Sequence, residues 1–214
     1  MSPRGHKPTE NKTMTPNVQS LIQTALNEDI GSGDITTDNL IQSDLEGYGI
    51  LIAKEPMVLA GIDIARQVFL ELDPAIVFHS QATDGTVIKT RQTIARVQGK
   101  LASLLKAERT ALNFLQRLSG IATHVRSYVQ LAGNTATQIV DTRKTTPGWR
   151  VLEKYAVRIG GARNHRMGLY DGVLIKDNHI AAFGGLKPSI EHIRRHVSHL
   201  IKIEVEVTDM DEVK

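Results

Sequence analysis

Three apolar segments of this 214-residue sequence end in charged residues whose types suit an anion-binding site. The segments are residues 138–141, 172–176 and 201–207, and the charged groups at or just after their ends are Arg143, Lys144, Lys176 and Glu206. Ligands of α/β sheets bind at the carboxyl ends of the strands, where the loops converge. If the three segments are strands of one sheet, we expect these four side chains to form one polar site.

Residues 143–148 (RKTTPG) are expected to open a helix, because Pro147 suits a position near the first helical turn. The positive end of the helix dipole and its free amides would then lie beside Arg143 and Lys144, an arrangement that suits a carboxylate or a phosphate. A solvated, well-capped helix start explains the same residues. This segment alone leaves both interpretations open.

The glycine pair Gly160-Gly161 is followed by three basic residues, Arg163, His165 and Arg166. Such a pair allows a helix to end and the backbone to approach a ligand closely. The Arg166 guanidinium is suited to forked binding of a carboxylate, and His165 can add a donor. A single histidine in a loop is more often a surface residue, but three basic groups in one loop favour anion binding.

Glu204 and Glu206 alternate with apolar residues, so both glutamates are expected on one face of a strand. Inside a barrel these carboxylates would need cationic partners, which Lys176 or Lys144 can supply. A half-exposed edge strand with solvated acids is the alternative.

Composition excludes several classes of protein. The chain has 41% hydrophobic residues, a net charge of +3 and no cysteine, so collagen-like, wholly disordered and disulfide-stabilised proteins are excluded. Residues 1–16 lack an apolar signal core and no apolar run approaches the roughly 20 residues of a membrane span, so we expect a cytoplasmic protein. Residues 141–166 hold seven basic and two acidic side chains, which indicates a local anionic ligand.

Periodicity predicts the elements that position these residues. Helices are expected at residues 18–26, 62–72, 102–118, 123–131, 149–159 and 188–200, and a loop at 27–37. Strands are expected at residues 48–53, 57–59, 76–79, 86–88, 93–98, 138–141, 172–176 and 201–207. The alternation of strands and helices after the middle of the chain predicts parallel strands.

The same pattern predicts a disordered tail at residues 1–15, an α+β domain at 16–116 and an α/β domain at 117–214. A closed α/β barrel usually needs about 250 residues and eight strands. The second domain has far fewer residues and strands than this, so it is either an open sheet or the first part of a barrel. We favour the partial barrel.

Several motifs in this order resemble the quinolinate phosphoribosyltransferase family. The motifs are NEDIGSGDITT (27–37), ERTALN (108–113) with SGIAT (119–123), DTRKTTPG (141–148), NHR (164–166), LIKDNH (174–179) and EVEV (204–207). The likeness covers roughly residues 18–214.

The resemblance implies an N-terminal α/β sandwich domain followed by an incomplete α/β (TIM-like) barrel. It implies a homodimer or larger homo-oligomer whose site is shared between subunits. The reaction would join quinolinate and phosphoribosyl pyrophosphate (PRPP), with Mg²⁺ bound with PRPP, to give nicotinate mononucleotide, pyrophosphate and CO₂ in NAD biosynthesis. Neither a nucleic acid nor a membrane is implied as a partner.

Residue roles follow from the matched motifs. The resemblance assigns the quinolinate carboxylates to Thr142, Arg143, His165 and Arg166, with Arg109 reaching in from the neighbouring subunit. It assigns the catalytic groups to Lys144, Lys176 and Glu206. The two lysines would meet phosphates or the second carboxylate. Glu206 would face the ribose and stabilise positive charge at the anomeric carbon, and no metal ligand is assigned.

Two departures from the family pattern stand out. Ala162 replaces a third glycine, and the family's chain continues beyond residue 214 with a further acidic strand end and phosphate-binding loops. We therefore expect residues 1–214 alone to be inactive or poorly folded, and the natural full-length protein to be active.

Three other functions remain open at this point. A paralogue of the same fold would use another acceptor, such as nicotinate. A Schiff-base aldolase would use Lys176 as its nucleophile, which borohydride trapping would detect. A nucleic-acid-binding module would use the basic segment, although nine aromatic residues offer few stacking platforms.

Overall fold

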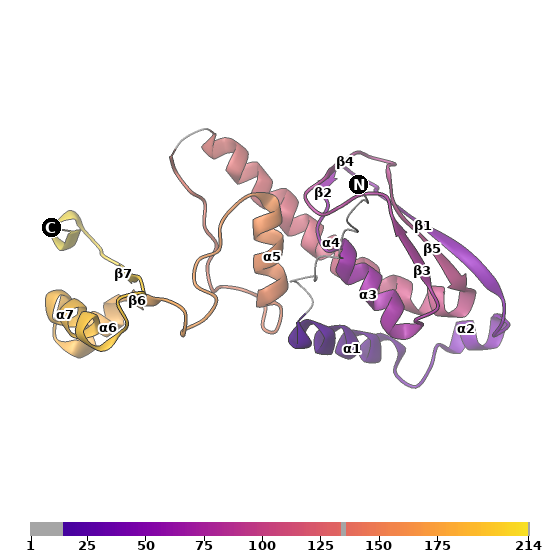
Figure 1. Cartoon of the computed structure of the whole chain (residues 1–214), viewed down its shortest axis with the longest axis horizontal. Coiled ribbons are helices and arrows are strands. Elements are labelled where there is room, and N and C mark those ends of the chain that lie inside the picture. The colour runs from indigo at the N-terminus through magenta and orange to yellow at the C-terminus, as the bar shows by residue number, and fades with distance from the viewer. Residues whose placement is uncertain (1–14, 134–135, 214) are drawn as a thin grey trace, which may run out of the picture. The chain divides into compact units, whose positions relative to one another are not determined.

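The computed structural model describes residues 15–133 and 136–213 (Figure 1). Of the predicted tail, residues 1–14 lie outside the described residues, and Thr15 is the N-cap of α1 (Pro16–Ile30). Pro16 occupies the first helical turn, where its missing N–H is not needed. The helix buries Val18, Ile22 and Leu26, the face that their spacing predicts.

The loop prediction for residues 27–37 is wrong at both ends. The first helix continues to Ile30, and α2 (Ile35–Leu40) begins within the segment. Asp34 starts α2, because its Oδ1 accepts hydrogen bonds from the backbone N–H of Thr36 at 3.0 Å and of Thr37 at 2.9 Å. Asp34 is thus the N-cap of a helix that begins inside the predicted loop.

An antiparallel sheet in the order β1-β5-β3 follows, and its three strands lie within two residues of the strands predicted at 48–53, 76–79 and 93–98. Its strands are β1 (Glu46–Ile52), β3 (Val77–Ser80) and β5 (Thr93–Lys100), and a separate antiparallel pair joins β2 (Met57–Val58) to β4 (Val87–Ile88). The helix α3 (Ile62–Leu72) has the predicted bounds. Its buried face includes Ile64, Ala65 and Val68, which belong to the main core.

A single helix, α4 (Leu101–Ala132), replaces the two that were predicted at 102–118 and 123–131. At the junction the Thr123 hydroxyl donates to the Ser119 carbonyl at 2.6 Å, and the buried Ser119 hydroxyl contacts the backbone of Ala60. The polar side chains at the junction thus have hydrogen-bond partners. The predicted domain boundary at 116/117 lies inside α4 and stays a prediction.

The rest of the chain alternates helices and short strands. Its elements are α5 (Arg150–Gly160), β6 (Val173–Ile175), α6 (Asp177–Phe183), α7 (Leu186–His196), β7 (Ile203–Val205) and α8 (Met210–Val213). The strands β6 and β7 pair in parallel, which confirms the predicted direction. The helices α6 and α8 were not predicted.

The predicted strand at 138–141 is wrong. This segment forms one isolated parallel bridge, between Val140 and Arg163. The Arg163 N–H donates to Ile139 O at 2.9 Å, and the Asp141 N–H donates to Arg163 O at 3.1 Å. Arg163 lies in a loop and supplies only this one bridge. Residues 138–141 therefore form no continuous ladder of strand hydrogen bonds.

The chain divides into two compact units. The first is the chain up to Asp141 together with Thr145–Asn164, and the second is Thr142–Lys144 together with His165–Lys214. The chain thus combines an N-terminal sheet-and-helix part with an α/β C-terminal part. Across residues 15–133 and 136–213, no helix is long and apolar enough to cross a membrane.

Candidate active site

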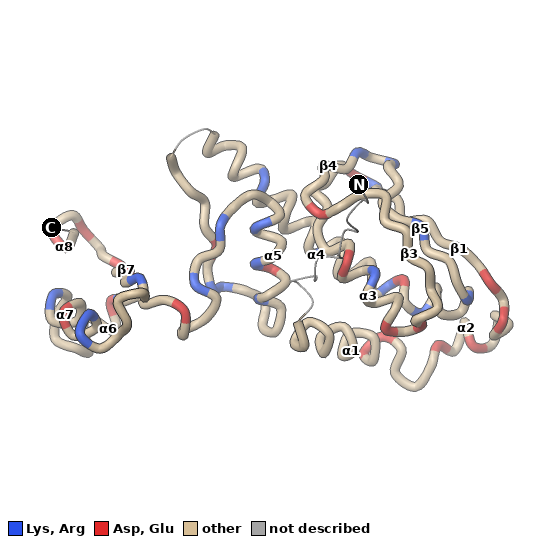
Figure 2. The backbone as a smooth tube through the Cα atoms, in the orientation of Figure 1, with Lys and Arg blue, Asp and Glu red and all other residues tan. Residues whose placement is uncertain are grey.

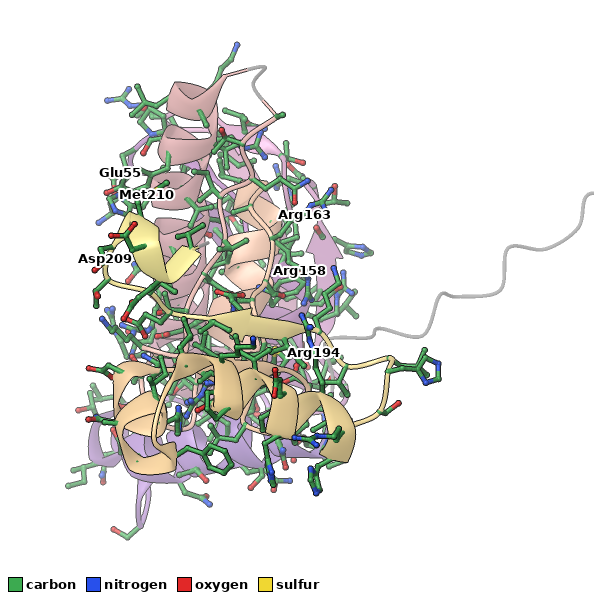
Figure 3. The ribbon with its side chains drawn as sticks, turned by 90° about the vertical axis from the view of Figure 1, so that its left-hand side faces the viewer. Glu55, Arg158, Arg163, Arg194, Asp209 and Met210 are labelled. Carbon is green, nitrogen blue, oxygen red and sulfur yellow. The ribbon has the colours of Figure 1, made fainter. Side chains whose placement is uncertain are left out.

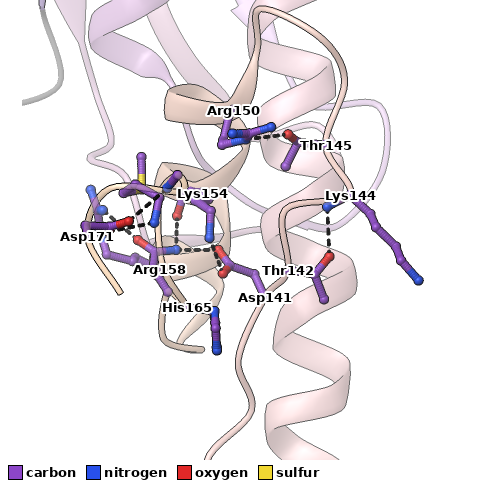
Figure 4. Close-up of polar contacts among 12 residues, drawn as sticks. Asp141, Thr142, Lys144, Thr145, Arg150, Lys154, Arg158, His165 and Asp171 are labelled. Atoms are coloured by element: carbon purple, nitrogen blue, oxygen red, sulfur yellow. Dashed lines mark hydrogen bonds and ion pairs between the residues drawn. The ribbon is translucent and has the colours of Figure 1, made fainter. Parts of the chain in front are cut away.

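Lys and Arg residues recur along α5 and the loops on either side of it (Figure 2). Arg158 on α5 and Arg163 after it are among those labelled in Figure 3. This helix also contains a buried lysine, Lys154, whose side chain is 1% exposed. The Lys154 ammonium forms an ion pair with Asp141 Oδ1 at 2.5 Å (Figure 4). A lysine this deeply buried requires such a partner.

Asn164 joins the same network. Its Nδ2 donates to Asp141 Oδ2 at 2.6 Å and to the Lys154 carbonyl at 2.9 Å. Arg158 Nη1 donates to Asn164 Oδ1 at 2.8 Å, which fixes the orientation of the amide. Asp141 and Asn164 are therefore held directly before Thr142 and His165, where the predicted basic loops begin.

The segment after Lys144 is anchored by a second set of contacts. Arg150 Nε donates to Thr145 Oγ1 at 3.0 Å, and the Thr146 N–H donates to Glu153 Oε2 at 3.1 Å. Arg117 on α4 forms an ion pair with Glu153. Burial raises the pKa of the Glu153 carboxyl, but hydrogen bonds from Arg117 and Thr146 outweigh burial and hold this pKa below its usual value.

Replacing Glu153 with Gln is expected to lower the free energy of unfolding by about 1–3 kcal/mol near neutral pH. A carboxyl whose pKa is depressed in the folded state stabilises the fold above its unfolded pKa, and this stabilisation is lost as the pH falls through the folded pKa. Urea unfolding should therefore show a difference between wild type and Glu153→Gln that shrinks on acidification. A difference that does not change with pH would contradict this role.

In the second unit, two predicted site residues, His165 and Lys176, face two glutamates. His165 Nε2 lies 2.8 Å from Glu204 Oε2, and Lys176 Nζ lies 3.2 Å from Glu206 Oε2. The pair between Lys176 and Glu206 confirms one of the two partners that the sequence suggested. Both glutamates are exposed while Ile203 and Val205 are half-buried, so the predicted alternation is confirmed, with solvated acids.

Arg166 is the strongest candidate for holding an anion. Its Nη1 donates to the Gly172 carbonyl at 3.0 Å, which orients the guanidinium. Its Nε is buried and meets no hydrogen-bond acceptor within the described part of the chain. Because a buried guanidinium N–H without an acceptor is costly, this donor is suited to a ligand anion.

Most of the predicted site residues belong to one of the two compact units. Seven of them belong to the second unit: Thr142, Arg143, Lys144, His165, Arg166, Lys176 and Glu206. Arg109 belongs to the first unit, where it is exposed on α4 and lines a cavity of about 770 Å³ between α4 and β1. The Lys144 N–H donates to the Thr142 hydroxyl at 3.0 Å, which stabilises the turn of that loop.

Sequence reasoning missed the residues that anchor these loops, Lys154, Asn164 and Glu153. A signal was present, because Glu153 and Lys154 are consecutive charges between the buried Leu152 and Ala156. Charges on the apolar face of a helix indicate a buried polar network.

The described residues contain no group of three or more His, Asp or Glu side chains that could hold a metal ion. A metal site made of protein ligands alone does not fit this part of the chain. Mg²⁺ that arrives on a substrate's phosphates requires only one or two carboxylates.

Two family descriptions match the chain. "Quinolinate phosphoribosyl transferase, N-terminal domain" matches residues 34–119, and "Quinolinate phosphoribosyl transferase, C-terminal domain" matches residues 121–214. A relative from Synechocystis, named probable nicotinate-nucleotide pyrophosphorylase [carboxylating], is 46% identical over 90% of this chain and 65% of its own length. A relative of the same name from Bacillus subtilis is 42% identical over 87% of this chain and 64% of its own.

Solved structures agree with these matches. NadC from Streptococcus pyogenes has a TM-score of 0.89 and 39% identity, over 93% of this chain and 71% of its own. The nicotinate-nucleotide pyrophosphorylase from Francisella tularensis has a TM-score of 0.89 and 40% identity, over 96% of this chain and 73% of its own. The chain spans just under two thirds of the length of the two curated relatives.

Proposed function

Because the chain belongs to the quinolinate phosphoribosyltransferase family, we propose that the natural full-length protein transfers the phosphoribosyl group of PRPP to quinolinate. The ring nitrogen of quinolinate forms a bond to the anomeric carbon while pyrophosphate leaves. The 2-carboxylate then departs as CO₂, and the electron pair of its bond stays on ring carbon 2, where the adjacent cationic ring nitrogen stabilises it. This carbon takes a proton from water, which gives nicotinate mononucleotide.

The observation that carries this proposal is the buried Nε of Arg166, together with the basic residues Arg143, Lys144 and His165 of the two loops. Quinolinate carries two carboxylates and PRPP carries a phosphate and a pyrophosphate. A pocket for both must be cationic, and guanidinium groups are well suited to carboxylates. We assign the quinolinate carboxylates to Thr142, Arg143, His165 and Arg166.

The remaining groups are assigned to PRPP and to the transition state. Lys144 and Lys176 bind phosphates or the second carboxylate, and Glu206 stabilises the positive charge that develops at the anomeric carbon as pyrophosphate leaves. The ion pair between Lys176 and Glu206 holds both groups at the start of this process. Mg²⁺ would be bound with PRPP and would neutralise part of its charge, with Glu206 as the candidate carboxylate.

We further propose that the protein is a cytoplasmic homodimer or larger homo-oligomer, without a nucleic-acid or membrane partner. Arg109 would then complete the site of a second copy, and the α/β part would be the beginning of a TIM-like barrel. The exposed position of Arg109 on α4 supports this role. The exposed, ion-paired Lys176 does not resemble a Schiff-base lysine, which needs an apolar pocket.

Turnover by the natural full-length protein tests the proposal. The protein is given PRPP, Mg²⁺ and quinolinate with a labelled 2-carboxyl carbon. We expect nicotinate mononucleotide and labelled CO₂ in equal amounts. Absence of both products from a protein shown to be folded by circular dichroism would overturn the assignment of quinolinate and leave the family membership standing.

A further inference from the structure

We propose that Lys154, Asp141 and Asn164 form a positioning clamp that sets the two basic loops, residues 142–144 and 165–166, at the spacing a dicarboxylate requires. The inference rests on the proposed function, since it concerns how the same site is assembled. None of the three clamp residues is assigned to the ligand.

The clamp lies where the chain passes from the first unit to the second. Asp141 is the last residue of the first unit before Thr142, and Asn164 is its last residue before His165. Consecutive Cα atoms are about 3.8 Å apart, so a shift of either clamp residue moves the start of a basic loop directly. The backbone bridge between Val140 and Arg163 holds the same two segments together one residue earlier.

Lys154 connects both segments through two of its groups. Its ammonium pairs with Asp141 Oδ1, and its carbonyl accepts a hydrogen bond from Asn164 Nδ2. Asn164 Nδ2 also donates to Asp141 Oδ2, so each of the three clamp residues contacts the other two. One residue on a rigid helix therefore fixes both loop origins at once (Figure 4).

Stability alone does not explain why these charges are buried. The Lys154 and Asp141 side chains are 1% and 9% exposed, and removing two charges from water largely cancels the gain from pairing them. Apolar residues of similar volume often stabilise such a site equally well. Directional hydrogen bonds, in contrast, fix a geometry that apolar contacts do not, and a site for two carboxylates needs fixed geometry.

Asn164→Ala provides the most direct test, because it removes the link to the second loop and leaves the ion pair between Lys154 and Asp141 in place. In the full-length protein we expect KM for quinolinate to rise and kcat to fall, each by about 10-fold or more. The thermal midpoint is expected to fall moderately, because Asp141 Oδ2 and the Lys154 carbonyl lose a donor. A purely structural role would lower only the fraction of active enzyme and leave KM for quinolinate unchanged.

Two further variants keep the test independent of folding. Lys154→Met leaves Asp141 buried without its cation and is expected to lower both thermal stability and quinolinate affinity. The double variant Asp141→Asn with Lys154→Met removes both charges and is expected to recover stability but not affinity. Lys106→Met is the matched control. It breaks the ion pair between Lys106 on α4 and Asp38 on α2, and it should leave KM for quinolinate unchanged.

The outcomes separate the clamp from the proposed function. A wild-type protein that does not bind quinolinate overturns the proposed function, and the clamp's role with it. An active wild type whose Asn164→Ala variant keeps the wild-type KM overturns the clamp alone, as does a double variant that recovers full quinolinate affinity.

Discussion

Replacing Arg166 with Met is expected to weaken quinolinate binding by about 30-fold to several thousand-fold, measured by calorimetry on the full-length protein. The Arg166 Nε is buried without an acceptor among the described residues, and its Nη1 is already anchored on the Gly172 carbonyl. The guanidinium is therefore oriented before the ligand arrives. Removing it would leave a ligand carboxylate desolvated without its cation.

Arg166→Lys separates geometry from charge. Lysine keeps the charge but lacks the planar fork that can hold Gly172 and a carboxylate together, so we expect it to restore only part of the affinity. Arg194→Met is the matched control, because Arg194 is an exposed arginine on α7 in the same unit. Wild-type affinity in Arg166→Met, or an equal loss in Arg194→Met, would contradict a specific role for Arg166.

Periodicity predicted those elements that bury one regular apolar face. The helix at 62–72 has the predicted bounds because its buried residues, such as Ile64 and Val68, follow the helical repeat closely. The antiparallel strands around β5 were found for the same reason, since they alternate between buried and exposed positions.

The errors arose where local residue types gave a misleading signal. Two helices were predicted at 102–118 and 123–131, but α4 is continuous across the junction, where Ser119 bonds to the backbone of Ala60. The apolar residues at 138–141 suggested a strand, although their bridge is with a single loop residue. Whether a segment finds a pairing partner depends on distant parts of the chain, which no local pattern contains.

The candidate site, too, could be predicted from the sequence only in part. The sequence indicated the basic residues of the loops, because the residue type alone shows that lysine, arginine and histidine can bind an anion. It did not indicate that Lys154 and Glu153 anchor those loops, since buried partners such as Asp141 and Arg117 are recognised only in three dimensions. The roles assigned to all eight site residues, from Arg109 to Glu206, stay predictions.

A site for quinolinate must distinguish a ligand with two carboxylates from a ligand with one. Nicotinate lacks the 2-carboxylate of quinolinate, so it would leave cationic donors of the site without a partner. A site built for a hydrogen-bonded group rejects an analogue that lacks this group by a large factor. We expect nicotinate to bind at least about 100-fold more weakly than quinolinate.

Equilibrium binding of quinolinate and nicotinate to the same preparation of full-length protein is the most direct test. We expect saturable quinolinate binding that Arg166→Met abolishes or greatly weakens, and much weaker nicotinate binding. Equal affinity for the two acids, or tighter binding of nicotinate, would show that the basic loops do not form a dicarboxylate site.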